Sequence, residues 1–229
     1  MRLDHTRHVG IFNASNLDVC LIGAGGIGAI TAITLGKMGI HGLEIFDDDL
    51  VDDVNLATQF HRVSDIGLKK VRTVNNSVWD FSRTMPQVYE QRITEESRLK
   101  PADVFISTVD SIASRQGVWQ AVKNSVVLDD PRLPSVWYLD ARMGAEVFEL
   151  FAVYMKDPDW YDVNISRAHD DDIPDLPCTS KATIYTANIA AGHIGAAIRR
   201  ILTGKQKPGF LRHDILNNEL SYLDMEEKP

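Results

Sequence analysis

The sequence has too few cysteines for a disulfide framework or a four-thiolate metal site. Its 229 residues include only two, Cys20 and Cys178, and paired Cys-x-x-Cys motifs, typical of structural zinc sites, are absent. We therefore expect a fold held together by packing, in a reducing compartment, the cytoplasm. Cys20 lies inside an apolar run and is expected to be a core residue.

Positive charge is also scarce. The chain has 24 Lys and Arg against 32 Asp and Glu, a formal net charge of −8. General nucleic-acid binding depends on a stripe of basic residues that neutralises a run of phosphates. The sequence offers no such stripe, so we expect no nucleic-acid partner.

A continuous membrane-spanning run is missing as well. The longest candidate, Val19 to Gly36, has 18 residues without a charge, which is near the minimum for a span. It contains five glycines, however, and a strand, a turn and a helix explain them better than one lipid-facing helix. The N-terminus lacks the apolar segment of a secretory signal. We expect no membrane association.

The order of the predicted elements indicates an α/β fold. No linker or repeat divides the chain, which we expect to form one domain over 1–229, with a parallel half at about 16–130 and an antiparallel half at about 135–225. In the first half, the expected strands are 17–22, 43–46, 88–93 and 103–108, and the expected helices are 27–37, 64–81 and 112–123. Such alternation is typical of a mostly parallel sheet with helices on its faces.

The second half predicts antiparallel strands. The runs 137–143 and 146–155 are separated by little more than two residues, and a parallel return needs a crossover of about a dozen or more. A loop is expected at 156–181, a helix at 182–201 and a last strand or hairpin at 211–223. The fold class is therefore Rossmann-like: a mostly parallel sheet continued by antiparallel strands, with helices on both faces.

A glycine-rich turn follows the first predicted strand. The sequence Gly-Ala-Gly-Gly-Ile-Gly at 23–28 opens a predicted helix, whose N-terminal N–H groups can bind an anion. An acid at the end of the second strand, Asp47, is placed to accept hydrogen bonds from ribose. We expect the nucleotide to contact Gly23, Gly25, Gly26 and Gly28. The turn alone does not distinguish NAD, FAD and ATP, and a turn that serves only packing is the alternative.

The residues after this acid distinguish between the nucleotides. Three aspartates at 47–49 are followed by Asn-Leu-Ala-Thr-Gln at 55–59 and by Asp-Ile-Gly-Leu-Lys-Lys at 65–70. This resembles the ThiF/MoeB/HesA family of ubiquitin-activating-enzyme-like adenylating proteins. The family pattern is an aspartate pair, a Ser-Asn-Leu-x-Arg-Gln box and Asp-x-Gly-x-x-Lys.

Two later segments extend the resemblance. The sequence Ser-Thr-Val-Asp-Ser at 107–111, with Arg115 five residues after Asp110, is similar to the Thr-Asp-Asn…Arg segment of the family. The run 140–146 resembles a strand and turn of some bacterial members. The resemblance covers roughly 16–204, and the motifs are specific jointly rather than singly.

The resemblance implies ATP·Mg²⁺ binding and adenylation of the C-terminal carboxylate of a small ubiquitin-like or sulfur-carrier protein, by a homodimer. By position, the resemblance implies that Asp47 binds the ribose and that Asn55 and Gln59 contact the nucleotide or its phosphates. It also implies that Lys70 pairs with phosphate charge and that Asp49 lies beside these residues. Asp110 is implied to be the Mg²⁺ ligand and the chief catalytic residue. Cys178 is the candidate acceptor of the activated carrier.

Several of these residues have a structural alternative. Lys70 could be a solvated helix residue, Asn55 a turn former, and Asp110 the N-cap of the following helix, because Asp is a favoured cap. Cys178 could equally be an inert thiol.

The chain also departs from the family pattern. Thr58 stands where the box has an arginine, and threonine supplies no charge. Arg62 is a nearby substitute, and Arg7 is the candidate for an arginine that crosses a dimer interface to the partner's ATP. These departures keep two other functions open: a catalytically silent ThiF-like binding subunit and, with less support, an NAD-dependent oxidoreductase.

Overall fold

The computed structural model describes residues 10–126, 136–166 and 182–225. The strands are β1 (Asp18–Ile22), β2 (Gly42–Phe46), β3 (Gln87–Tyr89), β4 (Val104–Ser107), β5 (Trp137–Gly144), β6 (Val147–Tyr154), β7 (Gly209–Asp214) and β8 (Glu219–Asp224). The helices are α2 (Gly26–Lys37), α3 (Lys70–Ser82), α4 (Ile112–Ser125), α5 (Asp159–Ser166) and α6 (Ile184–Leu202). Within these described ranges, no helix combines the length and apolarity needed to cross a bilayer.

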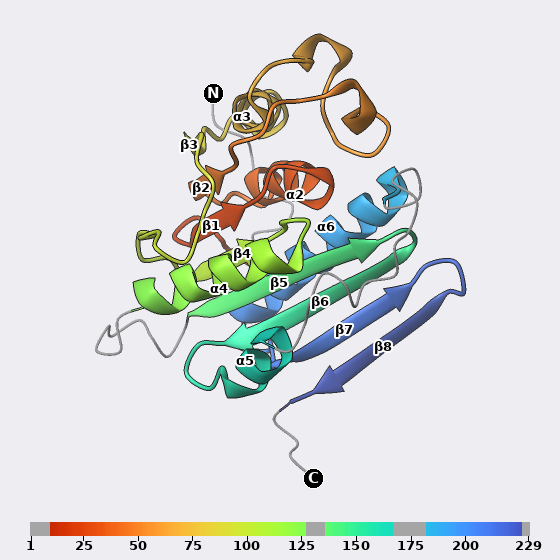
Figure 1. Cartoon of the computed structure of the whole chain (residues 1–229). Helices are drawn as coiled ribbons and strands as arrows, with labels where there is room; N and C mark the ends of the chain where they lie inside the picture. The colour runs from red at the N-terminus through yellow and green to blue at the C-terminus, as the bar shows by residue number, and fades with distance from the viewer. Residues whose placement is uncertain (1–9, 127–135, 167–181, 226–229) are drawn as a thin grey trace.

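All eight strands belong to one sheet, in the order β3-β2-β1-β4-β5-β6-β7-β8 (Figure 1). The pairs from β3 to β5 are parallel. The pairs from β5 to β8 are antiparallel. The change comes at the tight connection between β5 and β6, where Gly144 pairs with Val147. This confirms the predicted fold class, a parallel sheet continued by antiparallel strands.

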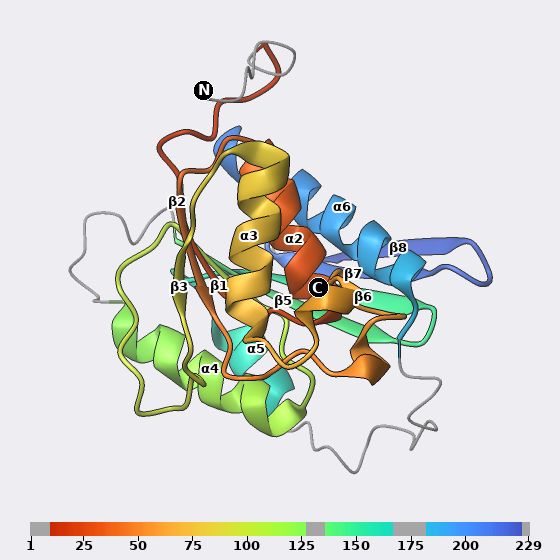
Figure 2. The ribbon, with the colours of Figure 1, turned by 90° about the horizontal axis from the view of Figure 1, so that it is seen from above.

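Helices cover both faces of the sheet (Figure 2). Helices α2, α3 and α6 lie on one face, and α4 and α5 lie on the other. Side chains of the central strands alternate between the two: Leu21 and Ile106 pack under the first group of helices, and Cys20 and Phe105 under the second. A strand buried on both faces has few polar positions, which explains the apolar runs in the sequence.

Two predicted elements are shorter than the sequence indicated. The helix predicted at 64–81 begins at Lys70, because Gly67 has a φ of +82° and Val63–Asp65 forms a separate 3-10 turn. The Asp65 carboxylate stabilises that turn by accepting a hydrogen bond from the Arg62 N–H (2.8 Å). Ser64 is therefore not the cap of the helix.

The strand predicted at 88–93 also ends early, at Tyr89. Its neighbour β2 ends opposite, at Phe46, and the Asp47 N–H donates the next bond back to the Tyr89 carbonyl. Beyond this point β3 has no strand to pair with among the described residues.

The loop predicted at 156–181 contains a helix. Helix α5 packs against α4 through the buried side chains of Tyr161 and Ile165, which are four residues apart and share one helix face. The Asp- and Pro-rich composition of the segment obscured this spacing. The helix predicted at 182–201 starts at Ile184, capped by the Thr183 side chain, and the predicted terminal hairpin is formed by β7 and β8.

Candidate functional site

A cleft lies at the carboxyl ends of β1, β2 and β4. Strand β1 is followed by α2 on one face of the sheet, and β4 is followed by α4 on the other, so the chain leaves an opening between them. In open α/β sheets, ligands bind at this switch point. Of the predicted site residues, the cleft is lined by Gly23, Gly25, Gly26, Asp47, Asp49, Gln59, Lys70 and Asp110. Gly28 and Asn55 are not among the residues that line it.

The glycine turn lacks room for side chains at two of its positions. Gly23 has a φ of +101°, and a Cβ there would lie 2.7 Å from the Thr108 Oγ1. A Cβ at Gly28 would lie 2.0 Å from the Gly23 carbonyl oxygen, so Gly28 lies beneath the turn instead of facing the cleft. Gly25, in contrast, would meet only the Gln59 amide, at 3.8 Å or more. The backbone at Gly25 is thus open to a ligand.

Replacing Gly28 by alanine is expected to lower the melting temperature, with a loss of roughly 1–3 kcal/mol or more, because the new methyl group forces the turn apart. Gly192→Ala is the matched control. Gly192 also lies in a helix, α6, and a Cβ there has no neighbour within 4 Å among the described residues. That change should be neutral or stabilising. Equal melting temperatures for the two variants would contradict the packing role of Gly28.

Asp47 joins the glycine turn to the loop that follows β2. One carboxylate oxygen accepts from the Ala24 N–H (2.7 Å) and the other from the Asp49 N–H (2.8 Å). Burial raises the pKa of Asp47, and these two N–H groups and Lys70 offset part of that rise. A carboxylate has about four acceptor positions, so lone pairs remain for a ligand hydroxyl.

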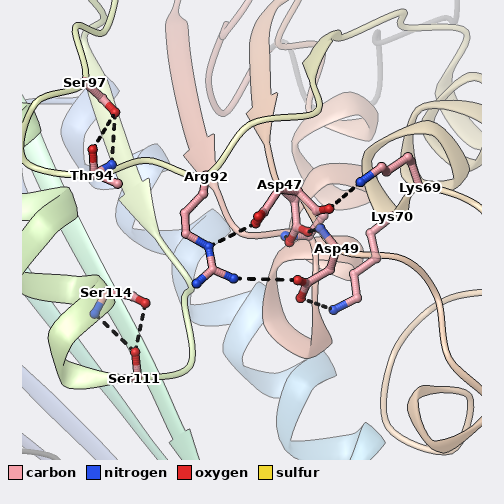
Figure 3. Close-up of polar contacts among 11 residues, drawn as sticks. Asp47, Asp49, Lys69, Lys70, Arg92, Thr94, Ser97, Ser111 and Ser114 are labelled. Atoms are coloured by element: carbon pink, nitrogen blue, oxygen red, sulfur yellow. Dashed lines mark hydrogen bonds and ion pairs between the residues drawn. The ribbon is translucent and has the colours of Figure 1, made fainter.

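Lys70 lines the cleft, and its side chain points toward Asp49 (Figure 3). The loop that leaves β2 returns antiparallel, with Leu50 opposite Lys69, and this brings the first residue of α3 back to Asp49. The Lys70 ammonium lies 2.8 Å from the Asp49 Oδ2, and the residue is only 7% exposed. The alternative reading of Lys70 as a solvated helix residue is therefore wrong.

The Asn55–Gln59 segment presents only one of its two predicted residues to the cleft. The Asn55 Oδ1 accepts from the Asp52 N–H (3.0 Å) and closes a short 3-10 turn, which is the turn-forming role considered as its alternative. Gln59 follows, with its amide beside Gly25, and its buried Oε1 has no hydrogen-bond partner in the described part of the chain. The Thr58 carbonyl oxygen lies beside Gly26, and Thr58 is not among the residues that line the cleft.

Asp110 is exposed at the cleft, on the loop between β4 and α4. It does not cap α4: the Ser111 side chain does so, accepting from the Ser114 N–H at 3.1 Å (Figure 3). The buried Arg115 guanidinium holds this loop by donating to the Val109 carbonyl. The capping alternative for Asp110 is therefore wrong, and its carboxylate is presented to the cleft.

Arg92 is a cleft residue that the motifs did not reveal. It follows β3, and its guanidinium lies 3.2 Å from the Asp48 Oδ1 and 3.9 Å from the Asp49 Oδ1. No sequence signal pointed to it, because residue 92 fell inside the strand predicted at 88–93, which in the structure ends at Tyr89. Arg62, the nearby substitute for the missing box arginine, pairs with Asp80 at 2.6 Å and does not line the cleft.

Cys178 and Arg7 lie outside the described residues. Cys20 is a core residue as predicted, and burial raises the pKa of its thiol far above the usual range.

The donor set of the cleft suits a hard divalent cation. Carboxylate oxygens of Asp47, Asp48 and Asp49 lie within 4.8 Å of one another, and Asp110 lines the same cleft. Mg²⁺ prefers oxygen ligands and is usually held by one or two carboxylates together with substrate phosphates. The residues present therefore fit Mg²⁺: Asp110 is exposed at the cleft, and Asp49 would have to exchange its ion pair with Lys70 for the metal.

The fold and the cleft define a Rossmann-like α/β protein with a glycine turn at the switch point of its sheet. Residues 2–229 match the sequence model of the ThiF family, and the chain belongs to this family.

Among curated proteins, the probable adenylyltransferase/sulfurtransferase MoeZ of Mycobacterium tuberculosis is 31% identical over 105 residues, which are 44% of this chain and 27% of MoeZ. Adenylyltransferase and sulfurtransferase MOCS3 of Dictyostelium discoideum is 31% identical over 111 residues, 46% of this chain and 26% of MOCS3. The match thus covers about a quarter of the length of these relatives.

A solved structure confirms the fold. The crystal structure of E. coli MccB with AMPCPP and MccA superimposes with a TM-score of 0.67 at 15% identity, over 95% of this chain and 66% of the MccB chain.

Proposed function

We propose that this protein is an adenylyltransferase that uses ATP·Mg²⁺ to activate the C-terminal carboxylate of a small ubiquitin-like or sulfur-carrier protein. The observation that carries the proposal is the cleft itself, where Gly25, Lys70 and Asp110 converge from three segments. The names of the relatives support it, since MoeZ and MOCS3 are both named adenylyltransferases. MccB has been crystallised with ATP.

In this proposal the cleft residues contact both the ribose and the phosphates of the nucleotide. Asp47 accepts from the ribose hydroxyls, and the free N–H groups at the start of α2 bind phosphate oxygens beside Gly25. The Lys70 ammonium, which lines the same cleft as the glycine turn, pairs with phosphate charge. Gln59 uses its unpartnered amide oxygen or its N–H₂ group at the same place.

The proposed reaction forms a bond between the carrier carboxylate oxygen and the α-phosphorus. The bond from this phosphorus to the bridging oxygen breaks, and pyrophosphate leaves with that electron pair. Carboxylate and phosphate repel each other, so fixed donors aimed at the phosphates lower the barrier. Lys70 and the N–H groups of the turn are such donors. Mg²⁺ held by Asp110 would neutralise charge on the phosphates when bound.

Asp110→Ala tests this assignment in an ATP–pyrophosphate exchange assay with candidate carriers. We expect exchange to fall by about 100-fold, because the variant loses the carboxylate that holds the metal. Asp53→Ala is the control, an exposed acid in the same acidic region that does not line the cleft. Exchange by Asp110→Ala at the rate of the unchanged protein would contradict the role of Asp110.

A catalytically silent ThiF-like subunit is the second candidate, and Thr58 favours it. Such a protein would bind the carrier but show no exchange at saturating ATP·Mg²⁺.

An NAD-dependent oxidoreductase would need only the glycine turn and Asp47, leaving Lys70 and Gln59 without a purpose. Calorimetric titration with ATP and with NAD separates this oxidoreductase from a protein that binds ATP. Analytical sedimentation tests whether the protein is the proposed homodimer. Cys178 remains a candidate acceptor of the activated carrier, and its replacement by serine would abolish any thioester or acyl-disulfide.

A further inference from the structure

Among the charged side chains that line the cleft, acidic groups outnumber basic ones, which disfavours the binding of a polyphosphate. Four are acidic: Asp47, Asp48, Asp49 and Asp110. Two are basic: Lys70 and Arg92. A nucleoside triphosphate adds further negative charge, so every cation near the turn matters. The box residue Thr58 adds none.

The two cations converge on one carboxylate. The Lys70 Nζ lies 2.8 Å from one oxygen of Asp49, and the Arg92 Nη2 lies 3.9 Å from the other (Figure 3). Asp49 thus occupies the position between an ammonium and a guanidinium that an external anion would take. These three side chains come from β2's following loop, from the start of α3 and from the segment after β3.

The contacts of Arg92 are of the kind that a ligand can replace. Its side chain is 63% exposed, and its partners Asp48 and Asp49 are 42% and 49% exposed, so solvent and salt weaken both pairs. The next residue, Ile93, is buried in the core and fixes the backbone from which Arg92 extends. A guanidinium also matches phosphate oxygens with two parallel donors.

We propose that Arg92 supplies the arginine contact to the triphosphate that Thr58 does not, exchanging Asp48 and Asp49 for phosphate oxygens when ATP·Mg²⁺ binds. This inference rests on the proposed function of the cleft. In this inference Arg92 and Lys70 together bind the triphosphate. The protein can then bind ATP although Thr58 replaces the box arginine.

Arg62, the substitute for the box arginine that the sequence analysis named, is less well placed to contact the triphosphate. Arg62 is the arginine nearest to Thr58 along the chain, but its guanidinium pairs with Asp80 on α3 and lies outside the cleft lining. Both members of that pair are about half exposed. Arg62→Ala is therefore a matched control for Arg92→Ala, since each removes an exposed arginine from an ion pair.

The test is calorimetric titration of the full chain with ATP·Mg²⁺ and with adenosine. Arg92→Ala is expected to weaken ATP binding by about 10- to 100-fold, the effect of losing charge-assisted hydrogen bonds, and adenosine binding by less than about threefold. Arg92→Lys should lie in between, because an ammonium keeps the charge but not the paired donors. Arg62→Ala should bind both ligands as the unchanged protein does.

The inference and the proposed function fail in different ways. ATP binding by Arg92→Ala as tight as that of the unchanged protein, or equal losses for ATP and adenosine, would overturn the role of Arg92 even where exchange activity is present. Loss of ATP affinity in Arg92→Ala, in a protein that shows no exchange with any carrier, would support Arg92 as a phosphate ligand while contradicting the adenylyltransferase proposal. Melting temperatures verify that each variant is folded.

Discussion

Lys70→Met is expected to reduce kcat/KM for ATP–pyrophosphate exchange by roughly 10²–10³-fold, the usual cost of removing one fixed donor from a site of developing phosphate charge. Methionine keeps the apolar stem that is buried at the start of α3. The effect should therefore come from the lost ammonium, which lies 2.8 Å from the Asp49 Oδ2 in the cleft. Steady-state exchange kinetics over a range of ATP concentrations measure it.

The neighbouring lysine provides the control for this prediction. Lys69 donates to the Asp48 carbonyl (2.5 Å) and does not line the cleft. Lys69→Met should change kcat/KM by less than about threefold, because in the proposed site it makes no phosphate contact. Equal losses in the two variants would show that Lys70 acts through the loop structure and not through its charge.

Asp140→Asn is expected to destabilise the fold by roughly 3–5 kcal/mol, as found when one member of a buried ion pair is removed. Asp140 is completely buried and lies between the guanidinium groups of Arg115 and Arg142. The Tyr161 hydroxyl donates to the same carboxylate at 2.8 Å. Asparagine would leave the buried Arg115 and the partly buried Arg142 without their counter-charge. Urea denaturation at neutral pH measures the loss.

The pH dependence of this loss follows from the pKa of Asp140. Burial alone would raise that pKa, but Arg115 and Arg142 outweigh burial and hold it below the ordinary value. A carboxyl with a lower pKa in the folded state stabilises the fold above its unfolded pKa of about 3.9, and this contribution disappears as the pH falls through the folded pKa. The difference between the unchanged protein and Asp140→Asn should therefore be full at neutral pH and shrink in acid.

A surface pair is the control for Asp140. Asp80 and Arg62 form an ion pair in which both side chains are about half exposed, and such pairs contribute about 0–1 kcal/mol. Asp80→Asn should therefore change stability little. A loss from Asp140→Asn that is no larger than that from Asp80→Asn would contradict the structural role of the buried carboxylate. Because Arg115 also holds the Val109 carbonyl, Asp140→Asn should in addition loosen the Asp110 loop and lower exchange.

Much of the fold could be predicted because local patterns determine it. Alternation of apolar runs with helical spacing gave the parallel half, and the short separation of the β5 and β6 segments required an antiparallel pair. Helix α5 was missed because two buried side chains, Tyr161 and Ile165, mark it over 159–165 in an Asp- and Pro-rich segment. The start of α3 was placed too early because periodicity does not register the left-handed Gly67.

The candidate site was predicted in part. The glycine turn and Asp47 are local to strand ends. Asp47, Gly23, Gly25 and Gly26 line the cleft, whereas Gly28 lies beneath the turn. The family motif assigned Asn55 to the nucleotide. In the structure its side chain instead stabilises a turn, because it accepts a hydrogen bond from the nearby Asp52 N–H.

By itself, the sequence determined the fold class, the glycine turn and the membership of a family whose motifs are spaced along the chain. Only the tertiary structure decided which distant charges meet: that Lys70 and Arg92 flank Asp49, and that Asp140 balances Arg115 and Arg142. The physical reason is that turns and periodicity depend on neighbours a few residues away. Contacts between charges depend on strand order and register, which bring together segments that no local pattern relates.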